Sequence, residues 1–145
     1  MSKIKTFRGL IADNSVETIH LKTLDGSTGY QIKSFEVMGY RPGTAIQESI
    51  VKIYSVKQTA GATTTIDFSE STLLAAAKLQ QHDSSAYQFE QHVIFSNTTF
   101  NQDIFVTHSD VDGTEPVNYH IELEQVPLKG TEIAVATLKN IKNRE

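Results

Sequence analysis

The sequence predicts an all-β protein: an antiparallel two-sheet β-sandwich of the jelly-roll kind, with about eight strands and one short helix near residues 70–81. Three observations lead to this prediction. Apolar and polar residues alternate with a period of two in several segments. Turn residues separate these segments at fairly even spacing, and only one segment is rich in strong helix formers. Consecutive strands without intervening helices favour a sandwich over an α/β fold.

The first half of the chain shows the weaker alternation. Its predicted strands are, in order, residues 16–24, 30–38, 48–56 and, as a short edge strand, 63–68. The glycine-containing segments 25–29 and 39–43 are expected to form a turn and a loop. Within the second of these strands the apolar positions change from even to odd numbers, so side chains must exchange faces. We therefore expect a bulge near Lys33 or Ser34.

The second half alternates more clearly, and each of its strands is expected to have one buried face. Its predicted strands are residues 87–95, 103–108, 117–125 and 133–138. Asp112 and Gly113 favour a tight turn between two of them. The one predicted helix, residues 71–81, is rich in Leu and Ala, and Asp67 or Ser69 is expected to cap its start.

Composition narrows the class of protein. The chain has 145 residues and no cysteine, so it is long enough for one packed domain, residues 1–145, and it has no thiolate metal site or disulfide. The start of the chain has no sustained apolar run, which predicts no secretory leader, no membrane span and synthesis in a cytoplasm. The formal net charge is −4, and basic residues gather at the two ends. An acidic body disfavours nucleic-acid binding, whereas basic ends suit an acidic protein partner.

Two clusters of acidic residues are candidate cation sites. His120, Glu122 and Glu124 share one face of a predicted strand, but the other histidines are scattered singly, so a polar outer face is the preferred interpretation. The segment 110–115 has part of the spacing of a calcium loop, yet it lacks the third acid and the distant glutamate. We interpret it as a turn, and we predict neither a metal nor another cofactor.

Catalytic motifs are absent from the sequence. Glycines occur singly, and no nucleophile elbow, phosphate-binding loop or zinc-protease motif is present. A triad built from distant Ser, His and Asp remains open at this stage, because such sites converge in space rather than in sequence. The prediction from the sequence is a protein that is not an enzyme.

Several segments resemble a group of small virion structural proteins of marine tailed bacteriophages. The segments, in order, are GYRPG, IVKIYSV, FNQDIFVTHSD, NYHIELEQVPL and AVATLKNI. The resemblance follows the order of strands and turns over about two-thirds of the chain and includes no catalytic motif. It implies a non-enzymatic component of a virion assembled in the host cytoplasm, most specifically a head decoration or cement protein. A connector or tail role is the alternative within this class, and no site residue can be carried over.

For a decoration role, residues 1–11 are expected to form an extended arm that contacts the capsid. The candidate contact residues are Lys3, Lys5, Phe7, Arg8, Leu10 and Ile11. Residues 139–145 are expected to form a C-terminal tail, and the expected partners are the major capsid protein or other virion proteins, with further copies of this chain. The alternative outside this class is a carbohydrate or host-surface binding module, which the absence of Trp disfavours because sugar sites use flat aromatic platforms.

Overall fold

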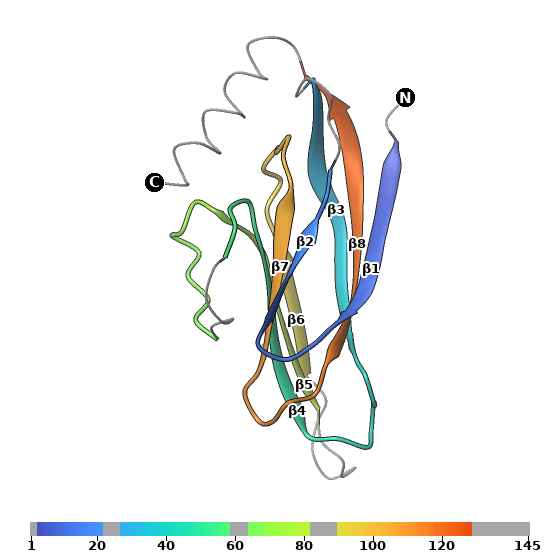
Figure 1. Ribbon diagram of the computed structural model, residues 1–145, viewed down its shortest axis with the longest axis vertical. Coiled ribbons are helices and arrows are strands. Elements are labelled where there is room, and N and C mark those ends of the chain that lie inside the picture. The colour runs from blue at the N-terminus through green and yellow to red at the C-terminus, as the bar shows by residue number, and fades with distance from the viewer. Residues whose placement is uncertain (1–2, 22–26, 59–63, 82–89, 129–145) are drawn as a thin grey trace.

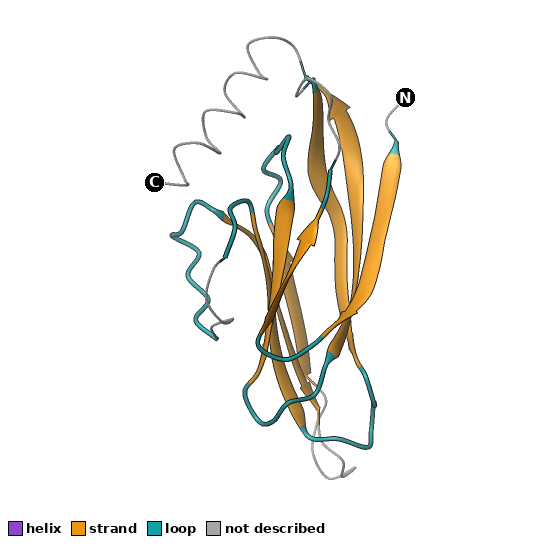
Figure 2. Ribbon diagram, viewed as in Figure 1, coloured by secondary structure: helices purple, strands orange, loops and turns teal. Residues whose placement is uncertain are grey.

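The computed structural model describes residues 3–21, 27–58, 64–81 and 90–128, and in this part of the chain every regular element is a β-strand (Figures 1 and 2). The strands are β1 (Ile4–Ile11), β2 (Ser15–Ile19), β3 (Thr28–Gly39), β4 (Gln47–Tyr54), β5 (Leu73–Gln81), β6 (Glu90–Phe95), β7 (Ile104–Asp110) and β8 (Val117–Pro127). None of the described residues belongs to a helix that is long and apolar enough to cross a membrane.

The strands form two sheets that lie face to face (Figure 1). One sheet has the order β1-β8-β3 and the other has the order β2-β7-β4-β5-β6, and all pairings are antiparallel. The prediction of an all-β, antiparallel, two-sheet sandwich of about eight strands is therefore confirmed. Neighbours in the sheets are mostly distant in the sequence, since the first strand pairs with the last and the second with the seventh.

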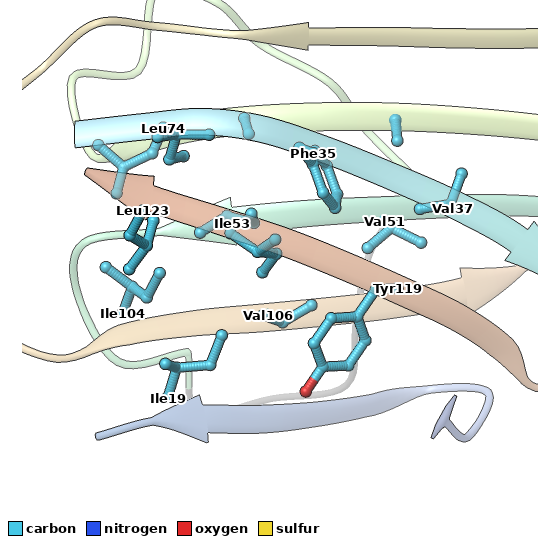
Figure 3. Packing of buried hydrophobic residues seen from close by; sticks show 14 of the residues in the cluster. Ile19, Phe35, Val37, Val51, Ile53, Leu74, Ile104, Val106, Tyr119 and Leu123 are labelled. Atoms are coloured by element: carbon cyan, nitrogen blue, oxygen red, sulfur yellow. The ribbon is translucent and has the colours of Figure 1, made fainter. Parts of the chain in front are cut away.

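The core lies between the sheets and is built by alternate residues of the facing strands (Figure 3). Phe35, Tyr119 and Leu123 project into it from the three-stranded sheet, and Ile53 and Val106 project from the five-stranded sheet. Burial of one face of each strand explains the period-two pattern of the sequence, because successive side chains of a strand point to opposite faces.

The expected bulge occurs in β3. The register of β3 against β8 shifts between Ile32 and Ser34, which confirms the prediction at Lys33 or Ser34. Before the shift Ile32 points into the core, and after it Phe35 does so. The extra residue thus keeps both halves of a twelve-residue strand facing the same core although their apolar positions differ in phase.

The predicted helix near 70–81 is wrong. Residues Leu73–Gln81 form β5, an interior strand between β4 and β6 (Figure 2). Ala75, Ala77 and Leu79 contribute to the core, while Lys78 and Gln80 alternate with them and are half-buried. Pairing with two neighbouring strands and burial of alternate side chains outweigh the intrinsic helix preference of Ala and Leu, which amounts to only a few tenths of a kcal/mol per residue, or about 0.7 at most.

The predicted edge strand at 63–68 is also wrong for its described part. Residues 64–67 have no regular structure, and a turn follows at Phe68 and Ser69. Asp67 caps this turn rather than a helix: its Oδ1 accepts hydrogen bonds from the backbone N–H (2.9 Å) and Oγ (2.6 Å) of Ser69. These two hydrogen bonds lower the pKa of the Asp67 carboxyl group.

The connection between β4 and β5 also contacts the outer face of the five-stranded sheet. Lys52 of β4 is 1% exposed, and its Nζ donates a hydrogen bond to the backbone oxygen of Thr65 at 2.7 Å. The same Nζ lies 5.4 Å from the centre of the Tyr54 ring, a cation–π distance. Burial lowers the pKa of Lys52. Lys52 therefore acts as a structural anchor for the connection.

The two ends of the chain were predicted to extend from the domain. From Ile4 onward the N-terminal segment lies in the three-stranded sheet, where β1 pairs with β8 over its whole length. The strand predicted at 133–138 and the tail predicted at 139–145 lie outside the described residues. The strand predicted at 87–95 is described from Glu90 onward, and contrary to expectation its residues are mostly exposed.

Candidate functional site

The strongest candidate site is the open edge of β1 together with the outer face of its sheet. The backbone N–H of Gln125 donates to the backbone oxygen of Lys3 at 2.7 Å, which makes Lys3 and Gln125 a hydrogen-bonded pair of the antiparallel ladder. Such pairs alternate along a ladder, so the odd-numbered residues of β1 bond to β8. The N–H and C=O groups of Ile4, Thr6, Arg8 and Leu10 point to the open edge, where no described strand pairs with them.

The structure separates the predicted contact residues by face. Ile11 is fully buried, and Phe7 is partly buried against the core. Arg8 and Leu10 are exposed on the opposite face of the strand. Lys5 lies on the core side of the strand but is exposed, and its Nζ donates to the Tyr30 hydroxyl at 3.5 Å.

Lys3 is exposed just before β1. Of the six predicted residues, Lys3, Lys5, Arg8 and Leu10 are therefore available to a partner. Period-two alternation is sufficient to place Arg8 and Leu10 on the face opposite Phe7 and Ile11, but it does not show that Lys5, on the same side as Phe7, is exposed.

The outer face contributes residues that the sequence did not single out. The ladder aligns Arg8, His120 and Glu36 in one row across β1, β8 and β3. The next row consists of Leu10, Asn118 and Met38. The two rows line a broad hollow of about 850 Å³, completed by Gly9, Val37, Tyr119 and, from β6, Gln91.

Glu36 and Met38 in this hollow were missed because strand alternation shows which face a residue occupies, whereas the order of the strands decides its neighbours. Met38 is 66% exposed and Leu10 is 44% exposed, so the hollow offers an apolar contact beside a charged row. The face also carries His120, Glu122 and Glu124, as the sequence predicted for a polar outer face. Among the described residues, no group of three or more His, Asp or Glu side chains is arranged to hold a metal ion.

A second cluster contains the Ser–His pair that catalytic triads use. The Ser49 hydroxyl lies 2.8 Å from Nε2 of His108, and Nδ1 of His108 lies 3.1 Å from the backbone oxygen of Ala12. Because the Ala12 oxygen only accepts, Nδ1 carries the proton and Nε2 accepts from Ser49. The amide of Gln47 donates to the same hydroxyl at 2.7 Å. Gln47, Ser49 and His108 are all fully buried, so the hydrogen bonds of this network lie inside the protein and link the segments that carry them.

The segment 110–115 forms the turn that the sequence favoured over a calcium site. Oδ1 of Asp110 accepts hydrogen bonds from the backbone N–H groups of Glu48 and Asp112, each at 3.1 Å. Its Oδ2 accepts from the backbone N–H of Glu115 at 2.9 Å. Both carboxylate oxygens are therefore used by the protein itself. Arg41 pairs with Glu115 and joins this turn to the β3–β4 loop.

Comparison with protein-family models, with curated proteins and with solved structures gives no match. The site thus combines a basic strand edge, which no described strand pairs with, and a hollow of mixed polarity.

Proposed function

We propose that this protein is a non-enzymatic structural component of a tailed-phage virion, acting as a head decoration or cement protein on the exterior of the capsid. The resemblance of its strand and turn segments to small virion proteins supports this role. The structural observation that carries the proposal is the open edge of β1, where four successive even-numbered residues present backbone groups that no described strand pairs with. The major capsid protein is the proposed partner.

The proposed binding mode is addition of a strand. An extended capsid segment pairs with Ile4, Thr6, Arg8 and Leu10 through main-chain hydrogen bonds, and its side chains enter the adjacent hollow. Lys3, Lys5 and Arg8 favour an acidic segment, because β1 and the residue before it carry no acid. A protein that binds only the assembled shell stabilises the shell by mass action, and this effect requires no catalytic step at the binding site.

The strand order supports the finer assignment of a jelly roll. In that fold the first strand pairs with the last and the second with the second-to-last. The pairs β1–β8 and β2–β7 follow this nested pattern, and β4–β5 forms its innermost pair. The strand β6 departs from it by pairing with β5 instead of β3. Jelly rolls are common among viral coat proteins, which agrees with the proposed role.

The first prediction concerns binding to virions. Arg8→Glu combined with Leu10→Glu lowers the formal charge of residues 3–11 from +3 to 0 and removes the apolar contact of Leu10, while both side chains are exposed and leave the core intact. We expect co-sedimentation of the purified protein with virions that lack it to fall at least about tenfold. Val111→Glu is the matched control, since Val111 is 51% exposed, against 44% for Leu10, but lies outside the site.

Truncation of residues 1–11 is a poor test of this proposal because it removes Phe7 and Ile11 from the core. Binding that is unchanged in the double variant would exclude the β1 edge as the contact. Cryo-electron microscopy of the virions then locates the protein. Density repeated over the head lattice supports decoration, whereas density confined to a tail or portal vertex would establish the connector or tail alternative.

The hollow also favours a second candidate, a carbohydrate or host-surface binding module. Arg8, Glu36, Asn118 and His120 offer several hydrogen-bonding groups within a single open depression. Sugars are bound by such convergent polar groups, together with an apolar surface of the kind that Met38 provides. Saturable glycan binding by the isolated protein, lost on Glu36→Ala, would support this function over capsid decoration.

A further inference from the structure

The strand β6 extends beyond the cover of the opposite sheet. The five-stranded sheet ends in β6, whereas the three-stranded sheet ends in β3 on the same side. Val93 packs partly against the core, but Phe95 on the same face is 39% exposed. On the outer face Ile94 is 56% exposed. A segment predicted from the sequence to be half-buried thus leaves apolar side chains uncovered on both faces.

The backbone of β6 is also open on one side. The N–H of Ser96 donates to the backbone oxygen of Leu74 at 2.9 Å, so the even-numbered residues of β6 bond to β5. The N–H and C=O groups of Gln91, Val93 and Phe95 therefore point to the opposite edge. No described strand pairs with β6 along this edge.

The four edges of the two sheets differ in how they are protected. The β1 edge carries lysine and arginine, which oppose pairing between like copies. The β3 edge is partly occupied, since Tyr30 and Phe100 exchange backbone hydrogen bonds of 2.7 and 3.0 Å there. The β2 edge carries the charged side chain of Glu17, which accepts a hydrogen bond from the Tyr119 hydroxyl. The β6 edge combines free backbone groups with apolar side chains and has no lysine, arginine or proline.

We propose that two copies of this chain pair antiparallel through β6, with Val93 on the two-fold axis. Only the odd-numbered residues direct their backbone groups away from β5, so the register must place odd opposite odd. Centring the pair on Val93 places Val93 opposite its own copy and Gln91 opposite Phe95, and it uses almost the whole strand. The two five-stranded sheets become one continuous sheet, joined by main-chain hydrogen bonds.

The side chains of β6 are complementary in this register. On the outer face His92 of one copy lies opposite Ile94 of the other, and Glu90 lies opposite Ser96. No like charges face each other across the axis, because His92 and Glu90 each lie opposite an uncharged residue. Within each strand, His92 contacts Glu90 at 2.8 Å. The uncovered apolar atoms of Ile94 and Phe95 become covered by the neighbouring strand. A second copy therefore satisfies both the free backbone groups and the exposed apolar residues.

Sedimentation velocity over a dilution series of the purified chain tests this pairing. We expect a monomer–dimer equilibrium that Ile94→Lys weakens by about tenfold or more, because an edge lysine opposes strand pairing. Phe68→Lys is the matched control: Phe68 is 65% exposed, it lies outside β6, and the substitution adds the same charge. Dimerisation that the control also abolishes, or a chain that stays monomeric throughout, would overturn the proposal.

A cysteine at the axis provides a second measurement that does not depend on weakening the interface. The chain has no cysteine, so Val93→Cys introduces a single thiol. Residues opposite each other in a hydrogen-bonded antiparallel pair have Cα atoms about 5.5 Å apart, within the range of a disulfide. Mild oxidation should give a covalent dimer, and Phe68→Cys should not. The absence of crosslinking at position 93 would exclude this register. Both measurements use the isolated protein, so their failure leaves the capsid-binding proposal unaffected.

Discussion

Gly9 of β1 lies directly opposite Tyr119 of β8, and the tyrosine ring occupies the space that a side chain at position 9 would need. A Cβ atom at this position would lie 3.0 Å from the Tyr119 hydroxyl oxygen and 3.1 Å from Cζ of the ring. The ring cannot easily move, because its hydroxyl donates to Oε2 of Glu17 at 2.8 Å. Burial and the nearby Glu17 also raise the pKa of Tyr119, so the hydroxyl keeps its proton as the donor.

The second prediction follows from this close approach. Gly9→Val should lower the free energy of unfolding by about 1 to 3 kcal/mol, because overpacking forces Tyr119 from its position. Urea denaturation measures the change. In a Tyr119→Leu background the ring is gone, so the same substitution should cost little. An equal cost in both backgrounds would show that the ring is not the cause.

The predicted contact residues show what a sequence can and cannot specify for a single side chain. Alternation in the segment from Ile4 to Ile11 is sufficient to place Phe7 and Ile11 on one face and Arg8 and Leu10 on the other. It gives no information about Glu36, which joins Arg8 only because β8 lies between β1 and β3. The candidate site was thus half predictable, since its other half depends on pairings between distant segments.

At the scale of the element, β5 shows where local preference misleads. Leu and Ala favour a helix, but the alternation of Lys78 and Gln80 with buried neighbours already favours a strand. Bonding to β4 on one side and to β6 on the other cannot be read from the segment itself. The strands β2, β3, β4, β7 and β8 were predictable because their β-branched and aromatic residues agree with their tertiary environment, whereas β1 was predicted only as an extended arm.

The third prediction tests whether residues 73–81 form a strand or a helix, by the sign of the stability difference between two variants at Gln80. Gln80 is half-buried and lies opposite Glu48 and Glu90 in the ladders of β5. In a strand, Gln80→Thr should be more stable than Gln80→Ala by about 0.5 to 1 kcal/mol. A helix would reverse the order, because alanine is the better helix former. Thermal unfolding of the two variants gives the comparison, and an alanine variant with the higher midpoint would contradict the assignment of β5.

At the scale of the whole molecule, the two sheets close at one end over a buried polar network. His108 and Ser49 belong to the five-stranded sheet, and Ala12, which accepts from His108, lies in the turn between β1 and β2. This turn contains Asn14, which has a positive φ of 55°. The hydrogen bond from His108 to Ala12 therefore attaches this turn, which leads from the three-stranded sheet to the five-stranded sheet, to β7. The sequence predicted the class of fold, but the sheet order and this network arise from contacts between segments far apart in the chain.

The fourth prediction is that stability falls in mild acid because of His108. Burial lowers its pKa in the folded protein, although Asp13 and Asp110 partly oppose this effect. The unfolded chain takes up a proton near pH 6.5, its usual value, while the folded protein keeps His108 neutral. The unfolded state then binds more protons, so the free energy of unfolding should decrease below about pH 6.5, by at most about 1.4 kcal/mol per pH unit.

Urea denaturation between pH 8 and pH 5 measures the pH dependence, with stability expected to be flat above pH 7. The carboxyl group of Asp67 contributes only at lower pH, since its pKa is below the ordinary 3.8. His108→Gln is the matched variant: it is less stable at neutral pH because it disturbs the hydrogen bonds to Ser49 and Ala12, but it cannot titrate. Its stability should therefore depend less on pH over this range. A variant with the same slope as the natural chain would assign the acid sensitivity to other groups and leave His108 a purely structural link between the sheets.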